Sequence, residues 1–228
     1  MIRVEQVDKT YHTGDSVVRA LRNVSMHIPD GQFISIAGPS GSGKTTLLNL
    51  IGCIDSVDKG EIWIDDKAVS TLGKHGKTEF RRSHLGFIFQ TYNLIPVLTA
   101  YENVAFVLSI LSVPEEEIKE RTLRILEEVG LKGMEQRRPD KLSGGQQQRI
   151  AIARALIKHP KIVLADEPTA NLDSKTGKEI LALMKQMNQR YGTTFVFSTH
   201  DQMVMDYAGR LVQLHDGQIV SDDSRSTQ

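Results

Sequence analysis

Residues 33–51 have the sequence FISIAGPSGSGKTTLLNLI, in which a glycine-rich turn separates two apolar runs. Phe33–Ala37 is typical of a buried strand, and Thr45–Ile51 has helical character. Between them, Gly38–Thr45 matches the phosphate-loop pattern G-x-x-x-x-G-K-[ST] at every position. A preceding strand and a following helix are the context in which this pattern binds phosphate, so a purely structural turn is the weaker interpretation.

The residue types of this loop suit phosphate chemistry. Glycines allow successive backbone N–H groups to curl around an anion, and the helix N-terminus adds the positive end of its dipole. Lys44 supplies a mobile positive charge, and the hydroxyl of Thr45 is a suitable Mg²⁺ ligand. The predicted phosphate-binding set is Gly38, Ser40, Gly41, Ser42, Gly43, Lys44, Thr45 and Thr46.

A second chemical element follows the apolar run Ile162–Ala165, which predicts another buried strand. Asp166 and Glu167 lie at the carboxyl end of that strand, where open α/β sheets bind their ligands. We expect Asp166 to hold Mg²⁺ through a water molecule and Glu167 to polarise the attacking water. An acidic pair that ends a strand is by itself equally consistent with solvated surface, but the phosphate loop in the same chain favours catalysis.

Strands and helices alternate along most of the chain, which predicts an α/β fold with a mostly parallel, doubly wound sheet. The first 36 residues favour short strands that form an antiparallel edge. A polar tail, Ser221–Gln228, is expected to fray. Strands are predicted at 33–37, 61–64, 85–89, 161–165, 194–198 and 210–214, helices at 45–51, 101–129, 144–157 and 174–190 (capped by Asp173 or Ser174), and turns at Gly14-Asp15, 29–31, 58–60 and Asp216-Gly217.

The composition excludes several classes of function. Among 228 residues, 28 Lys and Arg balance 28 Asp and Glu, so no global basic field would attract nucleic acid or an anionic membrane. Cys53 is the single cysteine and cannot form an intramolecular disulfide, which favours a reducing cytosol. The charged first residues do not resemble a secretory signal, and the longest apolar stretch, Val104–Leu111, is far shorter than the roughly 18 residues of a membrane span. A function at a membrane would therefore require a partner.

The segment Leu142–Gln146, LSGGQ, resembles the signature of ATP-binding-cassette (ABC) ATPases, and Arg149 and Ala153–Leu156 continue the likeness. Ser143 is a suitable cap for a helix that opens at Gly144 and Gly145, so that its N–H groups face an anion. The resemblance extends from Val4 to about Val220. It implies one domain, 1–228, with a P-loop NTPase (RecA-like) core, an antiparallel β sub-domain and an inserted α-helical sub-domain. The core and β sub-domain would comprise about 1–90 and 160–228, and the helical sub-domain about 91–159.

The resemblance also implies roles for single residues toward ATP and Mg²⁺. ATP would lie in the interface of a head-to-tail homodimer, where the signature of one copy closes over the γ-phosphate bound by the other. Tyr11 and His200 would otherwise be ordinary structural residues. The implied set is Glu167 and His200 for catalysis; Thr45, Gln90 and Asp166 for the metal; Tyr11 for stacking on adenine; and Ser143, Gly144, Gly145, Gln146 and Asp173 for contacts to the opposite subunit.

A narrower likeness concerns the lipoprotein-releasing and macrolide-export branch (LolD/MacB-type), with the FtsE-type division ATPase nearby. Phe89–Pro96, Leu98–Val104, Leu164–Thr169 and Ile51–Cys53 carry it, whereas Ala170 stands where the branch usually has glycine. The short chain leads us to expect that the membrane permease is a separate polypeptide, unlike in fused exporters. The likeness implies a location in the cytoplasm at the inner face of the membrane. Candidate contacts with the permease are Tyr92, Leu94 and residues 95–104, all of which could equally be core.

Other functions fit the sequence less well. ABC ATPases of DNA repair carry coiled coils or zinc modules between the phosphate loop and the signature, and residues 46–142 contain neither. Translation-associated members have two cassettes in one chain. A non-enzymatic module would be expected to have lost Lys44, Glu167 or His200. The cargo stays open, because lipoprotein release, antibiotic or peptide export and division use nearly the same ATPase.

Overall fold

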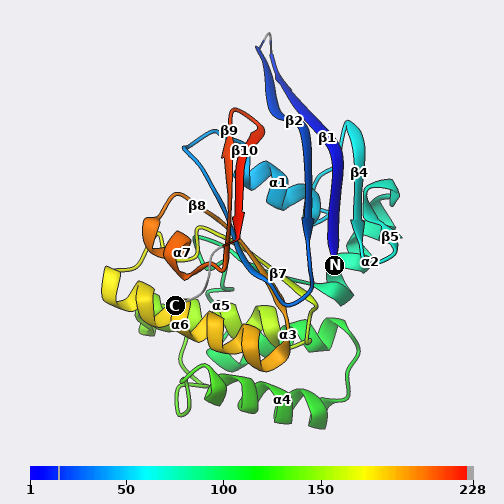
Figure 1. The fold of residues 1–228 in the computed structure, drawn as a ribbon. Helices are drawn as coiled ribbons and strands as arrows, with labels where there is room; N and C mark the ends of the chain where they lie inside the picture. The colour runs from blue at the N-terminus through cyan, green and yellow to red at the C-terminus, as the bar shows by residue number, and fades with distance from the viewer. Residues whose placement is uncertain (15, 225–228) are drawn as a thin grey trace. The chain divides into compact units, whose positions relative to one another are not determined.

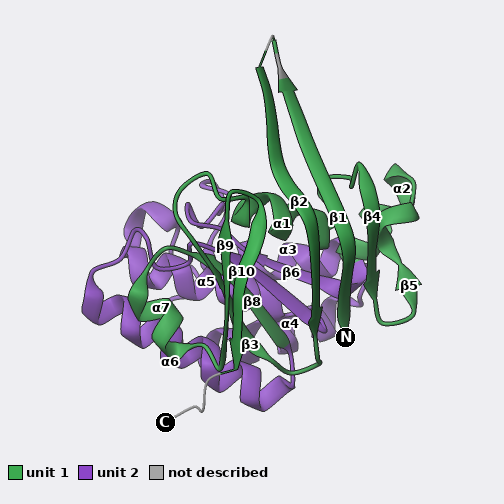
Figure 2. Ribbon diagram, turned by 45° about the horizontal axis from the view of Figure 1, so that its top comes forward, with its two compact units in different colours: residues 1–82, 194–228 green, residues 83–193 purple. Residues whose placement is uncertain are grey.

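The computed structural model describes residues 1–14 and 16–224. The chain forms two compact units, which Figure 2 colours separately. Unit 1 comprises residues 1–82 and 194–228, and unit 2 comprises residues 83–193. The sub-domain limits expected from the sequence, about 91–159 for the helical part, stay a prediction. Figure 1 labels the helices and strands.

One sheet of unit 1 is antiparallel, with the strand order β2-β1-β4-β5. Its strands β1 (Ile2–Thr13) and β2 (Ser16–Ile28) form a long hairpin, beside which lie β4 (Lys59–Ile64) and β5 (Lys67–Ala68). The predicted antiparallel β sub-domain is confirmed, but the expectation of short strands in this region was wrong for β1 and β2. The first four residues of β2 are exposed, so no apolar alternation marks where the strand begins. Asp15, in the predicted turn, lies outside the described residues.

Three further strands of unit 1 form the predicted parallel arrangement. The central strand β3 (Phe33–Ala37) is parallel to β8 (Thr194–Thr199) on one side and to β9 (Arg210–His215) on the other. Every residue of β3 and β8 is buried, including the polar Ser35, Thr194, Ser198 and Thr199. The helices of this part are α1 (Lys44–Ile51) and α7 (Gln202–Tyr207), and a 3₁₀ turn (Val69–Thr71) precedes α2 (Lys74–His84). The sequence had not indicated α2 or α7.

The predicted fraying of the polar tail was wrong for Ser221–Ser224. These residues belong to β10 (Gln218–Ser224), which pairs antiparallel with β9 after the predicted turn at Asp216-Gly217. Arg210 on β9 donates two hydrogen bonds to the carboxylate of Asp222, at 2.7 and 2.6 Å. Backbone pairing and this bidentate ion pair therefore order a segment that looks unstructured by composition. Residues 225–228 lie outside the described part.

Unit 2 combines a parallel strand pair with helices. Strand β6 (Leu85–Ile88) is parallel to β7 (Ile162–Asp166). The predicted helical region 101–129 is two helices, α3 (Ala100–Ile110) and α4 (Glu115–Glu128), and Pro114 is the N-cap of the second. A 3₁₀ turn (Pro139–Lys141) leads into α5 (Gly144–Leu156), and α3, α4 and α5 pack on one another. The last helix is α6 (Ser174–Tyr191).

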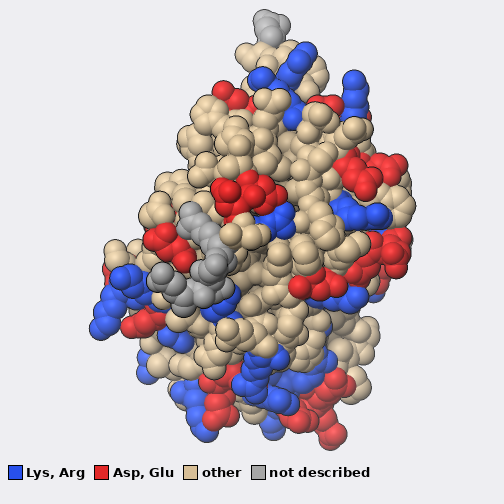
Figure 3. All heavy atoms as spheres, in the orientation of Figure 1, with Lys and Arg blue, Asp and Glu red and all other residues tan. Residues whose placement is uncertain are grey.

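The face drawn in Figure 3 shows no strong charge segregation. Acidic and basic side chains are interspersed on the face drawn in Figure 3, as the zero net charge leads one to expect. Within residues 1–14 and 16–224, none of the helices is both long and apolar enough to cross a bilayer.

Candidate functional site

The glycine-rich loop lies between β3 and α1 in unit 1, as predicted. Gly41 and Gly43 have φ angles of +80° and +103°, a region that side-chain-bearing residues rarely adopt. A Cβ on Gly38 would lie 2.0 Å from the carbonyl oxygen of Leu214. The loop can therefore keep this path only with glycine at these positions.

The interior of the loop suits a polyanion. Lys44 is buried, and its Nζ donates hydrogen bonds to the carbonyl oxygens of Gly38 (2.8 Å) and Pro39 (2.9 Å), so the ammonium group spans the loop. Helix α1 has Gly43 as its N-cap and no side-chain cap. The buried hydroxyl of Ser42 finds no partner among the described residues. Backbone donors, an ammonium group and a spare hydroxyl are what phosphate oxygens require.

Tyr11 lies beside this loop in unit 1. Its hydroxyl donates to Asp55 Oδ2 at 2.8 Å and is also hydrogen-bonded to Thr46, on the first turn of α1. Burial and the hydrogen bond to Asp55 raise the pKa of Tyr11, so the phenol stays neutral. The predicted adenine residue and the predicted phosphate loop are therefore neighbours.

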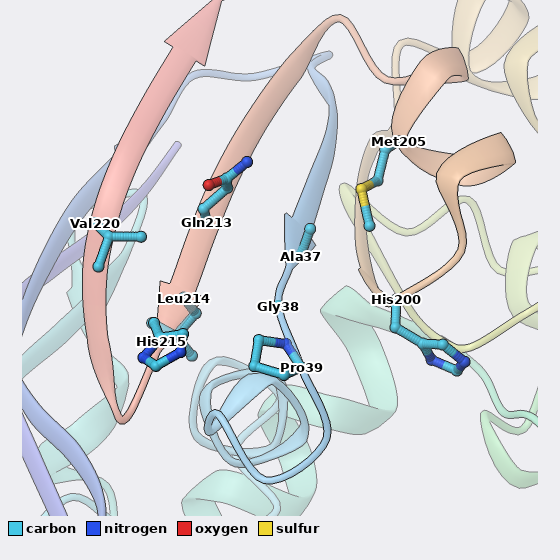
Figure 4. Close-up of a pocket in the computed structure, with 9 residues that line it drawn as sticks. All are labelled: Ala37, Gly38, Pro39, His200, Met205, Gln213, Leu214, His215 and Val220. Carbon is cyan, nitrogen blue, oxygen red and sulfur yellow. The ribbon is translucent and has the colours of Figure 1, made fainter.

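His200 and the phosphate loop share a pocket of 330 Å³ (Figure 4). His200 follows β8, and Gly38 and Pro39 follow β3, so the carboxyl ends of two parallel strands meet here. Met205 and His215 also line this pocket. No motif had indicated these two residues, because their place depends on how α7 and β9 return to the sheet.

The signature segment begins α5 in unit 2, and the predicted cap is confirmed. The hydroxyl of Ser143 accepts from the N–H of Gln146 (3.3 Å), and the Gln146 side chain accepts from the N–H of Ser143 (3.0 Å). A Cβ on Gly144 would lie 2.9 Å from the Tyr92 hydroxyl, and one on Gly145 would lie 2.6 Å from Cγ2 of Thr176. Both glycines thus allow close packing, and the helix begins without bulky side chains.

The segment after β6 connects Gln90 with the signature helix and with residue 171. Tyr92 and Asn93 have φ angles of +58° and +49°, and their carbonyl oxygens accept hydrogen bonds from the guanidinium of Arg154 on α5, at 2.6 and 2.5 Å. The carbonyl oxygen of Gln90 accepts from Asn171 Nδ2 at 2.9 Å. Arg154 was part of the family likeness in the sequence, but this role as a clamp was not foreseen.

Replacing Arg154 by Ala is expected to destabilise unit 2 by about 2 kcal/mol, since two backbone carbonyls lose a charged donor. Urea denaturation measures the change. The matched control is Arg124→Ala, because Arg124 is 69% exposed and its ion pair with Glu128 should contribute less than about 1 kcal/mol. Equal stability losses in the two variants would contradict the clamp.

Asp166 ends β7, and Glu167 follows it with a φ of +46°. The Glu167 carbonyl accepts from the N–H of Ala170 at 3.2 Å, and the Pro168 carbonyl accepts from Gln148 at 2.8 Å. Ala170 is exposed and is not among the residues with positive φ, so its methyl group fits this turn.

Asp173 is the N-cap of α6, one of the two residues predicted for that cap. It accepts hydrogen bonds from the N–H groups of Lys175 and Thr176, each at 3.0 Å. The hydroxyl of Thr176, with these backbone donors, lowers the pKa of Asp173. A structural role for Asp173 is thus clear, and its contact with a second subunit stays a prediction.

The predicted residues fall into two groups. Tyr11, the phosphate loop and His200 belong to unit 1, whereas Gln90, the signature, the acidic pair and Asp173 belong to unit 2. Within the described part of the chain, no cluster of three or more His, Cys, Asp or Glu is arranged to hold a metal ion.

A buried-lysine phosphate loop between a parallel strand and a helix defines a P-loop nucleotide-binding protein. The family model described as "ABC transporter" matches residues 21–170. The chain therefore belongs to the ABC transporter ATP-binding proteins, has their P-loop NTPase fold and is an ATPase.

The relatives are similar over nearly the whole chain. The ABC transporter ATP-binding protein MJ0796 of Methanocaldococcus jannaschii is 46% identical over 98% of this chain and 97% of its own length. The macrolide export ATP-binding/permease protein MacB of Escherichia coli is 43% identical over 97% of this chain, which spans 34% of MacB. The dimeric post-hydrolysis state of the MJ0796 cassette bound to ADP and Pi matches with a TM-score of 0.91 at 44% identity, covering 99% of both chains. The predicted likeness to the MacB branch is confirmed.

Proposed function

We propose that this chain is the ATP-hydrolysing subunit of an ABC transporter that dimerises head-to-tail around two ATP molecules. One observation carries the proposal: two helices, α1 and α5, have glycine at their N-termini, so that the backbone N–H groups there are suited to bind an anion. A pair of such chains can place the α1 site of one copy against the α5 site of the other. The dimeric, ADP- and Pi-bound structure of the related MJ0796 supports this arrangement.

In this proposal the phosphate loop binds the triphosphate through its N–H groups and Lys44. Thr45 and Gln90 would hold Mg²⁺ with their hydroxyl and amide oxygens, and Asp166 would hold it through a water molecule. Mg²⁺ supplies neutralisation of the phosphate charge when bound. Glu167 takes the proton of the attacking water, and His200 orients that water and donates to the γ-phosphate.

Residues of the second copy complete the site. Ser143, Gly144, Gly145 and Gln146 offer the donors at the start of α5 to the γ-phosphate, and Asp173 contacts the opposite subunit. Because ATP contacts both copies, its binding stabilises the dimer and its hydrolysis removes that contribution. The cycle of association and separation would move a membrane partner.

Replacing Ser143 by Arg tests the shared site. Ser143 is exposed, so an arginine there would fill the space that the nucleotide of the second copy would approach. Arginine also cannot accept the hydrogen bond that the N–H of Gln146 donates to the serine hydroxyl. We expect ATP-dependent dimerisation to be lost, while the affinity of the monomer for ADP stays within about twofold. Sedimentation with ATP and calorimetric titration with ADP measure the two properties. Loss of ADP binding by the monomer would contradict a site shared between copies.

The partner would be a separate permease of the lipoprotein-release or macrolide-efflux type. Unit 2 contains a groove of 530 Å³ whose lining includes Leu98, Tyr101, Phe106 and Ile118, with the acidic Glu102 and Glu115. Val97, Phe106 and Ile110 are exposed large apolar side chains in this region. A short amphipathic helix with a basic residue suits these walls. Tyr101 and Glu102 lie in the segment expected to meet the permease, whereas Tyr92 is half-buried against the signature.

In this proposal the protein is cytoplasmic, is held at the inner face of the membrane by its permease and binds no nucleic acid. The helical sub-domain of about 91–159 would contain the permease groove. MacB, whose name joins ATP-binding and permease parts, supports a partner of this kind.

A further inference from the structure

Tyr11 is fixed by a polar cluster that no part of the phosphate chemistry requires. The cluster consists of Lys9, Tyr11, Asp55, Ser56 and Lys77, all in unit 1. Asp55 lies in the loop between α1 and β4, so it follows the helix that starts at the phosphate loop.

Asp55 connects Tyr11 with Lys9. One carboxylate oxygen accepts from the Tyr11 hydroxyl at 2.8 Å, and the other accepts from Lys9 Nζ at 3.1 Å. The side chain of Lys9 is only 10% exposed, and its ammonium group lies 5.1 Å from the centroid of the Tyr11 ring. The ring is thus held at its hydroxyl and covered by a cation on one face.

The loop that presents Asp55 is itself anchored. Lys77 on α2 donates to the Asp55 carbonyl (3.1 Å) and to the Ser56 hydroxyl (2.5 Å), and Arg81 donates to the Cys53 carbonyl (2.6 Å). Burial alone would raise the pKa of Asp55, but hydrogen bonds from Ser56, Tyr11 and Lys9 lower it, so the carboxylate is charged at neutral pH. The Asp55 carboxylate that accepts from the Tyr11 hydroxyl is therefore charged, and its loop is held in place by Lys77 and Arg81.

We propose that Asp55 is a positioning residue for nucleobase binding: with Lys9, it holds the Tyr11 ring in a fixed orientation that leaves one face for adenine. Fixing the ring before the nucleotide arrives removes an ordering cost that binding would otherwise bear. The inference deepens the proposed function, because it rests on Tyr11 as the adenine platform.

The experiment compares ADP with pyrophosphate, since only ADP has a base. Each dissociation constant is measured by calorimetry on the full chain. For Asp55→Ala and for Tyr11→Phe, which keeps the ring and removes the hydroxyl, we expect ADP to bind about three- to tenfold more weakly. Pyrophosphate should bind as it does to the wild type. The double variant should lose less ADP affinity than the two single variants together, because both changes remove the hydrogen bond between Tyr11 and Asp55.

Asp58→Ala is the matched control, since Asp58 also pairs with Lys9, at 3.5 Å, and accepts a hydrogen bond from the N–H of Thr10 and not from the Tyr11 hydroxyl. It should change ADP affinity by less than twofold. Equal weakening of ADP and pyrophosphate by Asp55→Ala would overturn the proposal and assign Asp55 a general structural role. If Tyr11→Ala weakens ADP binding but Asp55→Ala and Tyr11→Phe do not, Asp55 has no positioning role, and Tyr11 is still the residue that contacts adenine. If Tyr11→Ala leaves ADP affinity unchanged, the adenine contact of the proposed function itself fails.

Discussion

Glu167→Gln is expected to lower the turnover of ATP at least about a hundredfold while ATP still binds, because the amide cannot take a proton from water. With hydrolysis stopped, the triphosphate stays in place and the ATP-bound dimer accumulates. The glutamine should keep the local backbone, since the carbonyl of residue 167 can still accept from the N–H of Ala170.

Phosphate release and size-exclusion chromatography at saturating ATP measure these two effects. Glu127→Gln is the matched control, because Glu127 is an exposed residue of α4 whose ion pair with Lys132 is at the surface. It should turn over ATP as the wild type does. A Glu167→Gln protein that remains monomeric with ATP, or that hydrolyses ATP normally, would contradict both the catalytic role and the ATP-bridged dimer.

Lys44→Ala is expected to weaken nucleotide binding by about 10- to 100-fold. This is the loss of affinity expected when a charge-assisted hydrogen bond to phosphate is removed. The ammonium group is already placed by the Gly38 and Pro39 carbonyls, so it meets the anion without further ordering. Lys44→Arg should not restore binding, because the larger, planar guanidinium cannot occupy the space of a compact ammonium group inside the loop.

Calorimetric titration with ADP measures the affinity, and thermal unfolding without nucleotide shows whether the loop change affects the fold. Lys119→Ala, a change of an exposed lysine on α4, is the control and should bind ADP normally. Undiminished ADP affinity in Lys44→Ala would show that the nucleotide binds elsewhere.

Local sequence patterns predicted most of the features that neighbouring residues form. The phosphate loop, the strand at residues 33–37, the cap at Ser143 and the parallel strands are all encoded within a few residues, through glycine conformation, apolar runs and capping chemistry. Helix α2 was missed because its polar composition hides a single buried face at Lys77 and Phe80. The order of Ser221–Ser224 was missed because it depends on pairing with β9 and on the ion pair between Asp222 and Arg210, which the polar composition does not reveal.

The sequence by itself determined the family, the phosphate loop and the residue types of an ATPase, because these depend on short motifs whose spacing fixes their geometry. Only the tertiary structure decided that Arg154 holds the turn after Gln90, that His200 and Pro39 line one pocket, and that Asp55 bonds to Tyr11. Each of these contacts joins residues dozens of positions apart. Such pairs come together only when burial of the apolar strands brings distant loops to the same end of a sheet.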